Sequence, residues 1–216
     1  MIVGYHIVFG AYGFWLPNDP RGSWSDFVGS WELFRFGKVT KTNERRSVAN
    51  LPHDHEKRLS AKMALKYPEI HFTGIQARAI GLGFGDYVDK TNLPIWSCAI
   101  LPEHVHLIVG RFRLTVEQLV IQLKGAATER LKEQGIHPLS EFASGSGNVP
   151  KCFARGEWKV FLDEEDLEQA IEYVEQNPIK EGKPRQHWKF VKPVEWMNSR
   201  IDPFFPRSAT PTPRRG

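Results

Sequence analysis

The chain has 216 residues, of which 41% are hydrophobic, 12% aromatic and 25% charged. This composition excludes a wholly disordered chain, and the length fits one well-packed domain. The net charge of +4 and the pI near 9.1 are compatible with a nucleic-acid partner without requiring one. No apolar run approaches the ~18 residues of a membrane span, so we expect no membrane partner.

The N-terminus and the cysteines bear on the compartment. The first sixteen residues are apolar, but they lack a basic leader and are interrupted by glycine, unlike a secretory signal. Cys98 and Cys152 are the two cysteines of the chain, which gives no disulfide framework. Both features favour the cytoplasm.

The N-terminal half predicts strands followed by one helix. Residues 4–9 (GYHIVF) have the aromatic and β-branched content of a strand, which ends at the turn-forming sequence PNDPRGSW. Residues 31–41 alternate well enough for a hairpin around Gly37. A helix is predicted over 73–88, although glycine lowers its helix propensity. Its glycines are Gly74, Gly81, Gly83 and Gly85.

A hairpin follows in the middle of the chain. Residues 95–101 and 104–109 are short apolar runs separated by Pro102 and Glu103. Proline is favoured at the first corner of a tight turn, so we expect these runs to pair as antiparallel strands.

The C-terminal half predicts two more helices with one strand between them. The first helix begins at Thr115 and ends at Gly135, and residues 155–162 (RGEWKVFL) form the strand. The second helix runs over 163–177 and is ended by Pro178. These elements indicate one α+β domain over residues 1–202, with a sheet covered by helices mainly on one face. Residues 203–216 are predicted to form a flexible basic tail.

Two histidines open the second strand of the hairpin in the sequence LPEHVHLIVG. Side chains at i and i+2 of a strand point the same way, so His104 and His106 can converge on one ion while Val105 and Leu107 face the other side. Neutral imidazoles bind divalent transition metals. The pair can equally be two half-buried residues satisfied by a carbonyl or water, and a metal site needs a third donor.

The helix over 163–177 carries a tyrosine beside its apolar stripe. That stripe consists of Leu167, Ala170, Ile171 and Val174. Tyr173 and Asn177, spaced i and i+4, fall on one side of it, where Asp166 is the acid that joins them. A phenol that attacks an anionic phosphate needs such a flank, because nearby carboxylates repel the substrate. Tyr173 alone can also be an ordinary boundary aromatic.

Taken together, three motifs resemble the single-tyrosine HUH transposases, and most of all the REP-associated tyrosine transposases. They are LPEHVHLIV, the helix QLKGAATERL at 122–131 and YVEQNPIKEG at 173–182. An N-terminal Tyr5-His6 strand precedes them in the same order as in the family. The resemblance runs from about residue 4 to about residue 195. Glu103 departs from it, since many relatives have Asn before the first histidine.

The resemblance implies a ferredoxin-like antiparallel sheet with the histidine pair on a central strand. His104, His106 and Asn177 would then hold Mg²⁺ or Mn²⁺, and Tyr173 would be the nucleophile. The implied activity is cleavage of single-stranded or hairpin DNA, with a 5′-phosphotyrosine intermediate and a free 3′ hydroxyl. A metal that draws charge off the phosphate suits a tyrosine, whose ordinary pKa of ~10 makes it a poor nucleophile at neutral pH.

Basic residues interleaved with aromatics suggest how DNA is held, since lysine and arginine bind phosphates and rings stack on bases. The candidates near the tyrosine helix are Lys180, Lys183, Arg185, Trp188 and Lys189, and the resemblance adds Lys124 in the helix flanking the active site. An earlier cluster, Arg35 to Arg46, is better explained as a solvated face.

Two other functions remain open from the sequence. One is a binding module that grips structured single strands without turnover, and the other is a His-x-His metallohydrolase in which Tyr173 is incidental. The resemblance leaves both a monomer and a homodimer with exchanged tyrosine helices open.

Overall fold

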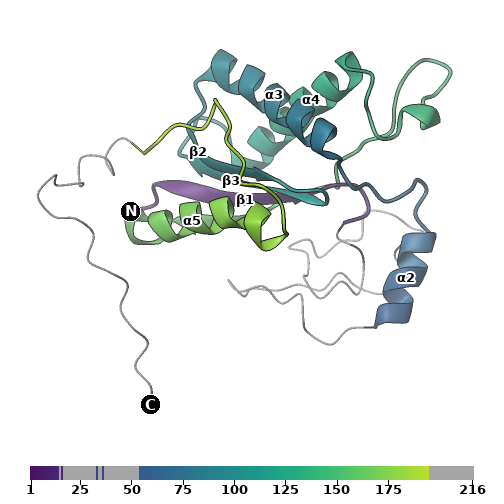
Figure 1. Cartoon of the computed structure of the whole chain (residues 1–216), viewed down its shortest axis with the longest axis horizontal. Helices are drawn as coiled ribbons and strands as arrows, with labels where there is room; N and C mark the ends of the chain where they lie inside the picture. The colour runs from purple at the N-terminus through teal and green to yellow at the C-terminus, as the bar shows by residue number, and fades with distance from the viewer. Residues whose placement is uncertain (15, 17–32, 34–35, 37–53, 195–216) are drawn as a thin grey trace, which may run out of the picture.

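A four-stranded antiparallel sheet forms the centre of the computed structural model, which describes residues 1–14, 16, 33, 36 and 54–194 (Figure 1). The spatial order of the strands is β2-β3-β1-β4. They are β1 (Gly4–Gly10), β2 (Ile95–Ile100), β3 (His104–Gly110) and β4 (Trp158–Leu162). The N-terminal strand therefore lies between β3 and β4, and the predicted hairpin of β2 with β3 is confirmed.

Helices cover both faces of this sheet. In Figure 1, α3 and α4 lie together on one face and α5 lies alone on the other. The helices are α2 (His55–Met63), α3 (Gly74–Thr91), α4 (Val116–Glu133) and α5 (Glu164–Lys180), and a short 3₁₀ turn spans Ser140–Phe142. The α+β class is thus confirmed, with most helical cover on one face. No helix in the described part of the chain is long and apolar enough to cross a membrane.

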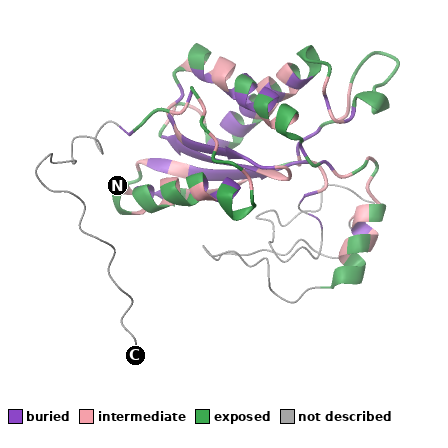
Figure 2. Cartoon of the chain, in the orientation of Figure 1, coloured by how far each residue is buried: buried purple, intermediate pink, exposed green. Residues whose placement is uncertain are grey.

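The alternation of side chains along the strands gives each face its own apolar core. On the α3 and α4 side, Phe9 and Leu107 are fully buried and belong to one large cluster with Phe84. The smaller cluster under α5 joins Ile108 of β3 to Val174 of α5. Figure 2 shows β1, β2 and β3 largely buried between the two layers and the outer side of α5 exposed. The sheet therefore presents one face to α5, which is where the histidines point.

The glycines of α3 are explained by close packing. A Cβ at Gly83 would lie 2.6 Å from the carbonyl oxygen of Ala126, so α4 can approach this closely because no side chain intervenes. A Cβ at Gly81 would lie 2.1 Å from the ring of Trp188. The low helix propensity of this segment is offset by the packing that glycine permits and by the capping box at Thr73.

The end of the tyrosine helix and the presence of α2 differ from the sequence prediction. Pro178 does not end the tyrosine helix, which continues to Lys180 and ends where Gly182 adopts a φ of +68°. Proline has no N–H to donate to the carbonyl of Val174, so the helix continues past Pro178 without that hydrogen bond and ends two residues later. Helix α2 was not predicted. The hairpin at 31–41, apart from Leu33 and Phe36, and the tail at 203–216 lie outside the described residues.

Substitution of Gly83 by alanine is expected to destabilise the protein by about 1 to 3 kcal/mol, because the new methyl group would overlap the α4 backbone. Gly85→Ala is the matched control in the same helix, since its Cβ would meet Phe190 at an ordinary 3.5 Å. The control should be neutral or stabilising by up to about 1 kcal/mol through helix propensity. Urea unfolding of both variants measures the difference, and equal effects would contradict the packing explanation.

Candidate metal and nucleophile site

Three histidines from two neighbouring strands lie on the sheet face that α5 covers. His104 and His106 occupy alternate positions of β3, and their ring centroids are 4.7 Å apart. His6 of β1 adds a third imidazole, whose Nε2 lies 3.0 Å from Nδ1 of His106. The predicted placement of His104 and His106 on one face, opposite the buried Val105 and Leu107, is therefore what the sheet produces.

Helix α5 brings Tyr173 to these histidines. The Tyr173 ring centroid is 5.8 Å from that of His6 and 5.9 Å from that of His106, in both cases with the rings tilted edge to face. The side chain remains 41% exposed. Packing of Leu167 and Val174 into the smaller core sets the rotation of the helix that achieves this. Tyr173 thus contacts the buried imidazoles and still faces solvent.

Asn177 lies one turn after Tyr173 on the buried side of the same helix. Its side chain is 9% exposed, and its amide nitrogen Nδ2 has no hydrogen-bond partner among the described residues. The two ends of an asparagine amide are assigned from their hydrogen bonds, and neither end is fixed when a partner is missing. A buried amide with unused capacity fits a group that would donate its oxygen to a cation.

Burial keeps His6 and His106 neutral. It lowers the pKa of His6 to about 4 and holds the pKa of His106 well below its ordinary value. Repulsion between a protonated His106 and a positive charge on His104 or His6 lowers the pKa of His106 further. Neutral imidazoles are the form that binds metals, because protonation occupies the nitrogen lone pair. The two buried imidazoles are therefore in the state that a cation requires.

The donor set suits a divalent metal only if an amide takes part. Within the described ranges, no three His, Cys, Asp or Glu side chains are arranged to hold an ion together. A site built on His104 and His106 would therefore need a ligand of another type, and Asn177 as that ligand stays a prediction. The Phe14 ring stacks on His104 at 4.9 Å and limits the positions that this imidazole can take.

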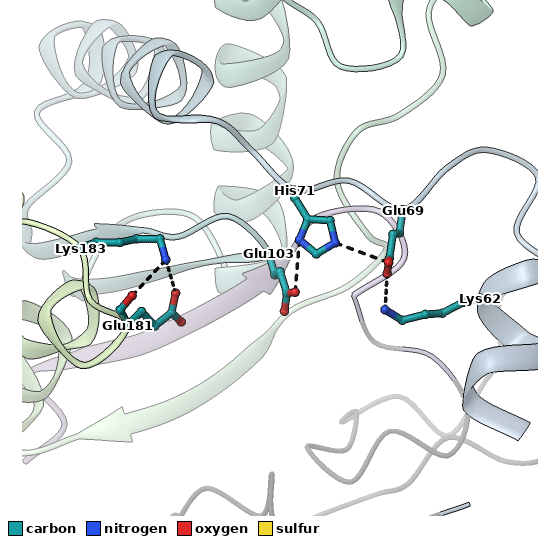
Figure 3. Close-up of polar contacts among 6 residues, drawn as sticks. All are labelled: Lys62, Glu69, His71, Glu103, Glu181 and Lys183. Atoms are coloured by element: carbon teal, nitrogen blue, oxygen red, sulfur yellow. Dashed lines mark hydrogen bonds and ion pairs between the residues drawn. The ribbon is translucent and has the colours of Figure 1, made fainter. Parts of the chain in front are cut away.

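Glu103, which the sequence left unexplained, belongs to a chain of polar contacts beside the site (Figure 3). Its carboxylate lies 3.3 Å from Nδ1 of His71, whose Nε2 lies 3.5 Å from Glu69. Glu69 in turn pairs with Lys62 of α2 at 2.5 Å. These contacts link the turn immediately before His104 to α2 and to the segment that follows it. The glutamate thus helps to fix the start of the histidine strand.

Lys124 is engaged inside the protein, on the opposite face of the sheet from the histidines. Its ammonium donates hydrogen bonds to the carbonyls of Ala154 and Gly156 at 2.8 and 2.7 Å, and it lies 5.1 Å from the centre of the Phe9 ring. Burial lowers its pKa to about 8. These contacts fix the segment that leads into β4. A DNA contact by Lys124 stays a prediction.

The basic residues after the nucleophile differ in their surroundings. The Lys180 ammonium lies 4.9 Å from the centre of the Tyr173 ring. Lys183 pairs with the Glu181 carboxylate at 3.2 Å, as Figure 3 shows, and Arg185 lies 3.8 Å from Glu175. Lys180 is thus the predicted DNA-binding cation that the structure brings to the tyrosine.

The segment that follows α5 covers the edge of the sheet. The Gln186 side chain exchanges two hydrogen bonds of 2.8 Å with the backbone of Ile100 in β2. Trp188 packs against Gly81 of α3 and stacks on Phe190, with ring centroids 5.9 Å apart, while Lys189 is exposed. The Trp188 ring is therefore used within the fold, and a role for it or Lys189 in DNA binding stays a prediction.

His6 is the site residue that the sequence did not select. The Tyr5-His6 pair enters the sequence prediction only through the family resemblance. The sequence feature that could have identified His6 is an imidazole inside an otherwise apolar strand. Its contact with His106, however, depends on the pairing of β1 with β3, one hundred residues away. A single sequence does not reveal that register.

Solved structures that are similar to this chain include two transposases. One is described as a REP-associated tyrosine transposase bound to a REP hairpin, with a TM-score of 0.42 and 11% identity over 83% of this chain and 68% of that one. The other is described as a "putative transposase" from Deinococcus radiodurans R1, with a TM-score of 0.38 and 14% identity over 82% of this chain and 91% of that one. No family model and no curated protein matches the chain.

The burial of His6 predicts acid sensitivity of the metal-free protein. Its pKa is 6.5 in an unfolded chain and about 4 here, so the unfolded chain binds the proton more readily between those values. Stability is full above pH 6.5 and is lost as the pH falls through this window. From about pH 7 to about pH 5, His6 alone should lower the free energy of unfolding by about 2 kcal/mol.

Urea unfolding in the presence of a chelator measures this loss. His6→Gln removes the titrating group, so the variant should lose less stability than the wild type over the same pH range. An unchanged pH dependence in His6→Gln would contradict the burial of a neutral His6.

Proposed function

We propose that the chain is a metal-dependent endonuclease and strand transferase of single-stranded DNA, of the transposase type, with Tyr173 as the nucleophile. The observation that carries the proposal is the position of Tyr173, whose ring lies 5.8 and 5.9 Å from the rings of two buried neutral histidines and is 41% exposed. A phosphate arriving from solvent can reach the phenol, which lies beside the imidazole cluster. That combination suits phosphoryl transfer to tyrosine.

The reaction proposed for Tyr173 is a transesterification. The phenolic oxygen forms a bond to the 5′ phosphorus, the bond from phosphorus to the 3′ oxygen breaks, and the 3′ oxygen leaves as a hydroxyl with the proton that the phenol gives up. Because a phosphodiester is exchanged for a phosphotyrosine bond, another 3′ hydroxyl can reverse the step without ATP. Cleavage and rejoining of DNA hairpins, as in transposition, follow from the same chemistry.

The cation proposed for this site is Mg²⁺ or Mn²⁺, held by His104, His106 and Asn177. It would supply positive charge that polarises the scissile phosphate, which a tyrosine of ordinary pKa needs for attack. The neutral state of His106 and the unpartnered amide nitrogen of Asn177 support this ligand set. A metallohydrolase built from His, Asp or Glu ligands is less well supported, since the described residues contain no such cluster of three.

Lys180 is proposed to guide the DNA backbone to the nucleophile. Its ammonium lies over the Tyr173 ring, which places a positive charge where the phosphate would arrive. Lys183 and Arg185 already lie near Glu181 and Glu175, and these acids would compete with phosphate for them. We therefore rank Lys180 first among the phosphate contacts.

Tyr173→Phe should abolish covalent attachment of the protein to labelled hairpin DNA in the presence of Mn²⁺, because the attacking oxygen is removed. A denaturing gel detects the adduct. Tyr5→Phe is the control, since Tyr5 also lies at the sheet but packs on Phe161 on the other face. It should retain the adduct. An adduct that persists in Tyr173→Phe rules out this nucleophile.

Lys180→Gln should weaken binding of hairpin DNA more than Lys183→Gln, because Lys183 is partly neutralised by Glu181. Loss of one phosphate contact also lowers the slope of log affinity against log salt by about 1. Fluorescence anisotropy at several salt concentrations gives both quantities. Equal losses in the two variants would refute the ranking of Lys180.

A further inference from the structure

We propose that His6 is a positioning residue of the metal site, whose Nε2 accepts a hydrogen bond from Nδ1–H of His106 and so leaves the Nε2 lone pair of His106 for the cation. His6 is an additional functional residue beyond the two strand histidines and Asn177. The inference rests on the proposed metal site, but it does not depend on DNA cleavage.

The contact is built into the sheet. His6 pairs with Ile108 in the register of β1 and β3, and His106 pairs with Val8, so the two imidazoles are diagonal neighbours on one face. Their facing nitrogens are 3.0 Å apart, and the side chains are only 8% and 6% exposed. Since β1 is also paired with β4 on its other edge, the register that creates the contact is held from both sides.

The rings around His6 hold its orientation. Trp158 of β4 meets the His6 ring at a centroid distance of 5.1 Å and an angle of 89°, and Tyr173 meets it at 5.8 Å and 67°. These edge-to-face contacts leave the imidazole little room to turn. The Nε2 atom is therefore directed at His106 by packing on two sides.

The position of one proton decides what His106 can do. Each neutral imidazole carries one N–H, and the hydrogen bond requires one proton between the two facing nitrogens. If His6 donated it, His106 would carry its own proton on Nε2 and could not bind a cation there. If His106 donates it from Nδ1, its Nε2 keeps a free lone pair. Metal-binding histidines commonly donate their other N–H in this way, which fixes tautomer and ring orientation.

His6 is better suited to this role than to direct ligation. Its Nε2 faces Nδ1 of His106 within hydrogen-bond distance, and the His6, His104 and His106 imidazoles are not arranged to hold an ion among themselves. The third ligand is instead available from Asn177. His6 thus supports the ligand set without joining it.

Two variants separate the hydrogen bond from the volume of the side chain. His6→Phe keeps a flat ring and loses the acceptor, whereas the side-chain oxygen of His6→Gln can replace Nε2. Calorimetry with Mn²⁺ alone should show affinity lowered by about 10 to 100-fold in His6→Phe and largely restored in His6→Gln. His187→Gln, an exposed histidine outside the cluster, is the control and should bind Mn²⁺ as the wild type does.

A measurement on the metal-free wild type decides the proposal even if His6→Phe fails to fold or Mn²⁺ does not bind. Nitrogen-15 NMR of the histidines, with His106 assigned through its substitution, should show the proton on Nδ1 of His106. A proton on Nε2 of His106 would overturn the proposal. It would also be overturned if a folded His6→Phe variant bound Mn²⁺ with the affinity of the wild type.

Pulsed EPR of the Mn²⁺ complex should detect two coordinated imidazoles. Detection of three would mean that His6 is a ligand, which would also overturn the proposal. If the NMR, calorimetry and EPR results are as expected but the protein does not cleave DNA, the proposed function is wrong and the role of His6 in the metal site stands.

Discussion

The antiparallel pairing of β1 with β3 is the constraint on which the rest of the site depends. It inserts the N-terminal strand between β3 and β4 and fixes which residues of each strand share a face. A shift of one residue would turn every side chain of β1 to the other face, so His6 would leave the α5 side and Phe9 would leave the larger core. The burial of Phe9 and Ile7 therefore sets the position of the imidazoles.

The site combines buried polarity with an exposed nucleophile. Three imidazoles lie on the sheet face that α5 covers, and α5 carries the buried amide of Asn177 beside the apolar contacts of the smaller core. Burial of such polar groups without partners costs free energy. The contact of His6 with His106 offsets part of that cost, while the amide of Asn177 retains unused capacity. Residues that serve folding alone are seldom left in this state. The smaller core under α5 supplies the stability that lets the helix carry Tyr173 at its edge.

Much of the fold and part of the site follow from local sequence. The alternation in HVHLIVG indicated a strand with both histidines on one face, and helical periodicity placed Tyr173 beside the stripe of Leu167 and Val174. Local sequence patterns could not predict the contacts between segments that are far apart in the chain. The glycines of α3 lowered its predicted helix propensity, yet Gly81 makes room for Trp188 and Gly83 for α4. Likewise, Lys124 looks like a surface lysine in its own helix but is held by carbonyls that lie thirty residues later. His6 and Glu103 gained their roles only through contacts across the sheet and its turns.

The central claim is that Tyr173, placed over the histidine cluster, becomes covalently attached to the 5′ phosphate of cleaved DNA. Replacing the bridging 3′ oxygen of the scissile bond by sulfur yields a leaving thiol that rejoins poorly, so the attached state should accumulate. Tandem mass spectrometry of the digested adduct then identifies the modified residue. We expect a nucleotide on Tyr173, within the peptide from α5. A nucleotide on any other side chain, or cleaved DNA with a free 5′ phosphate and no attached protein, would contradict the claim.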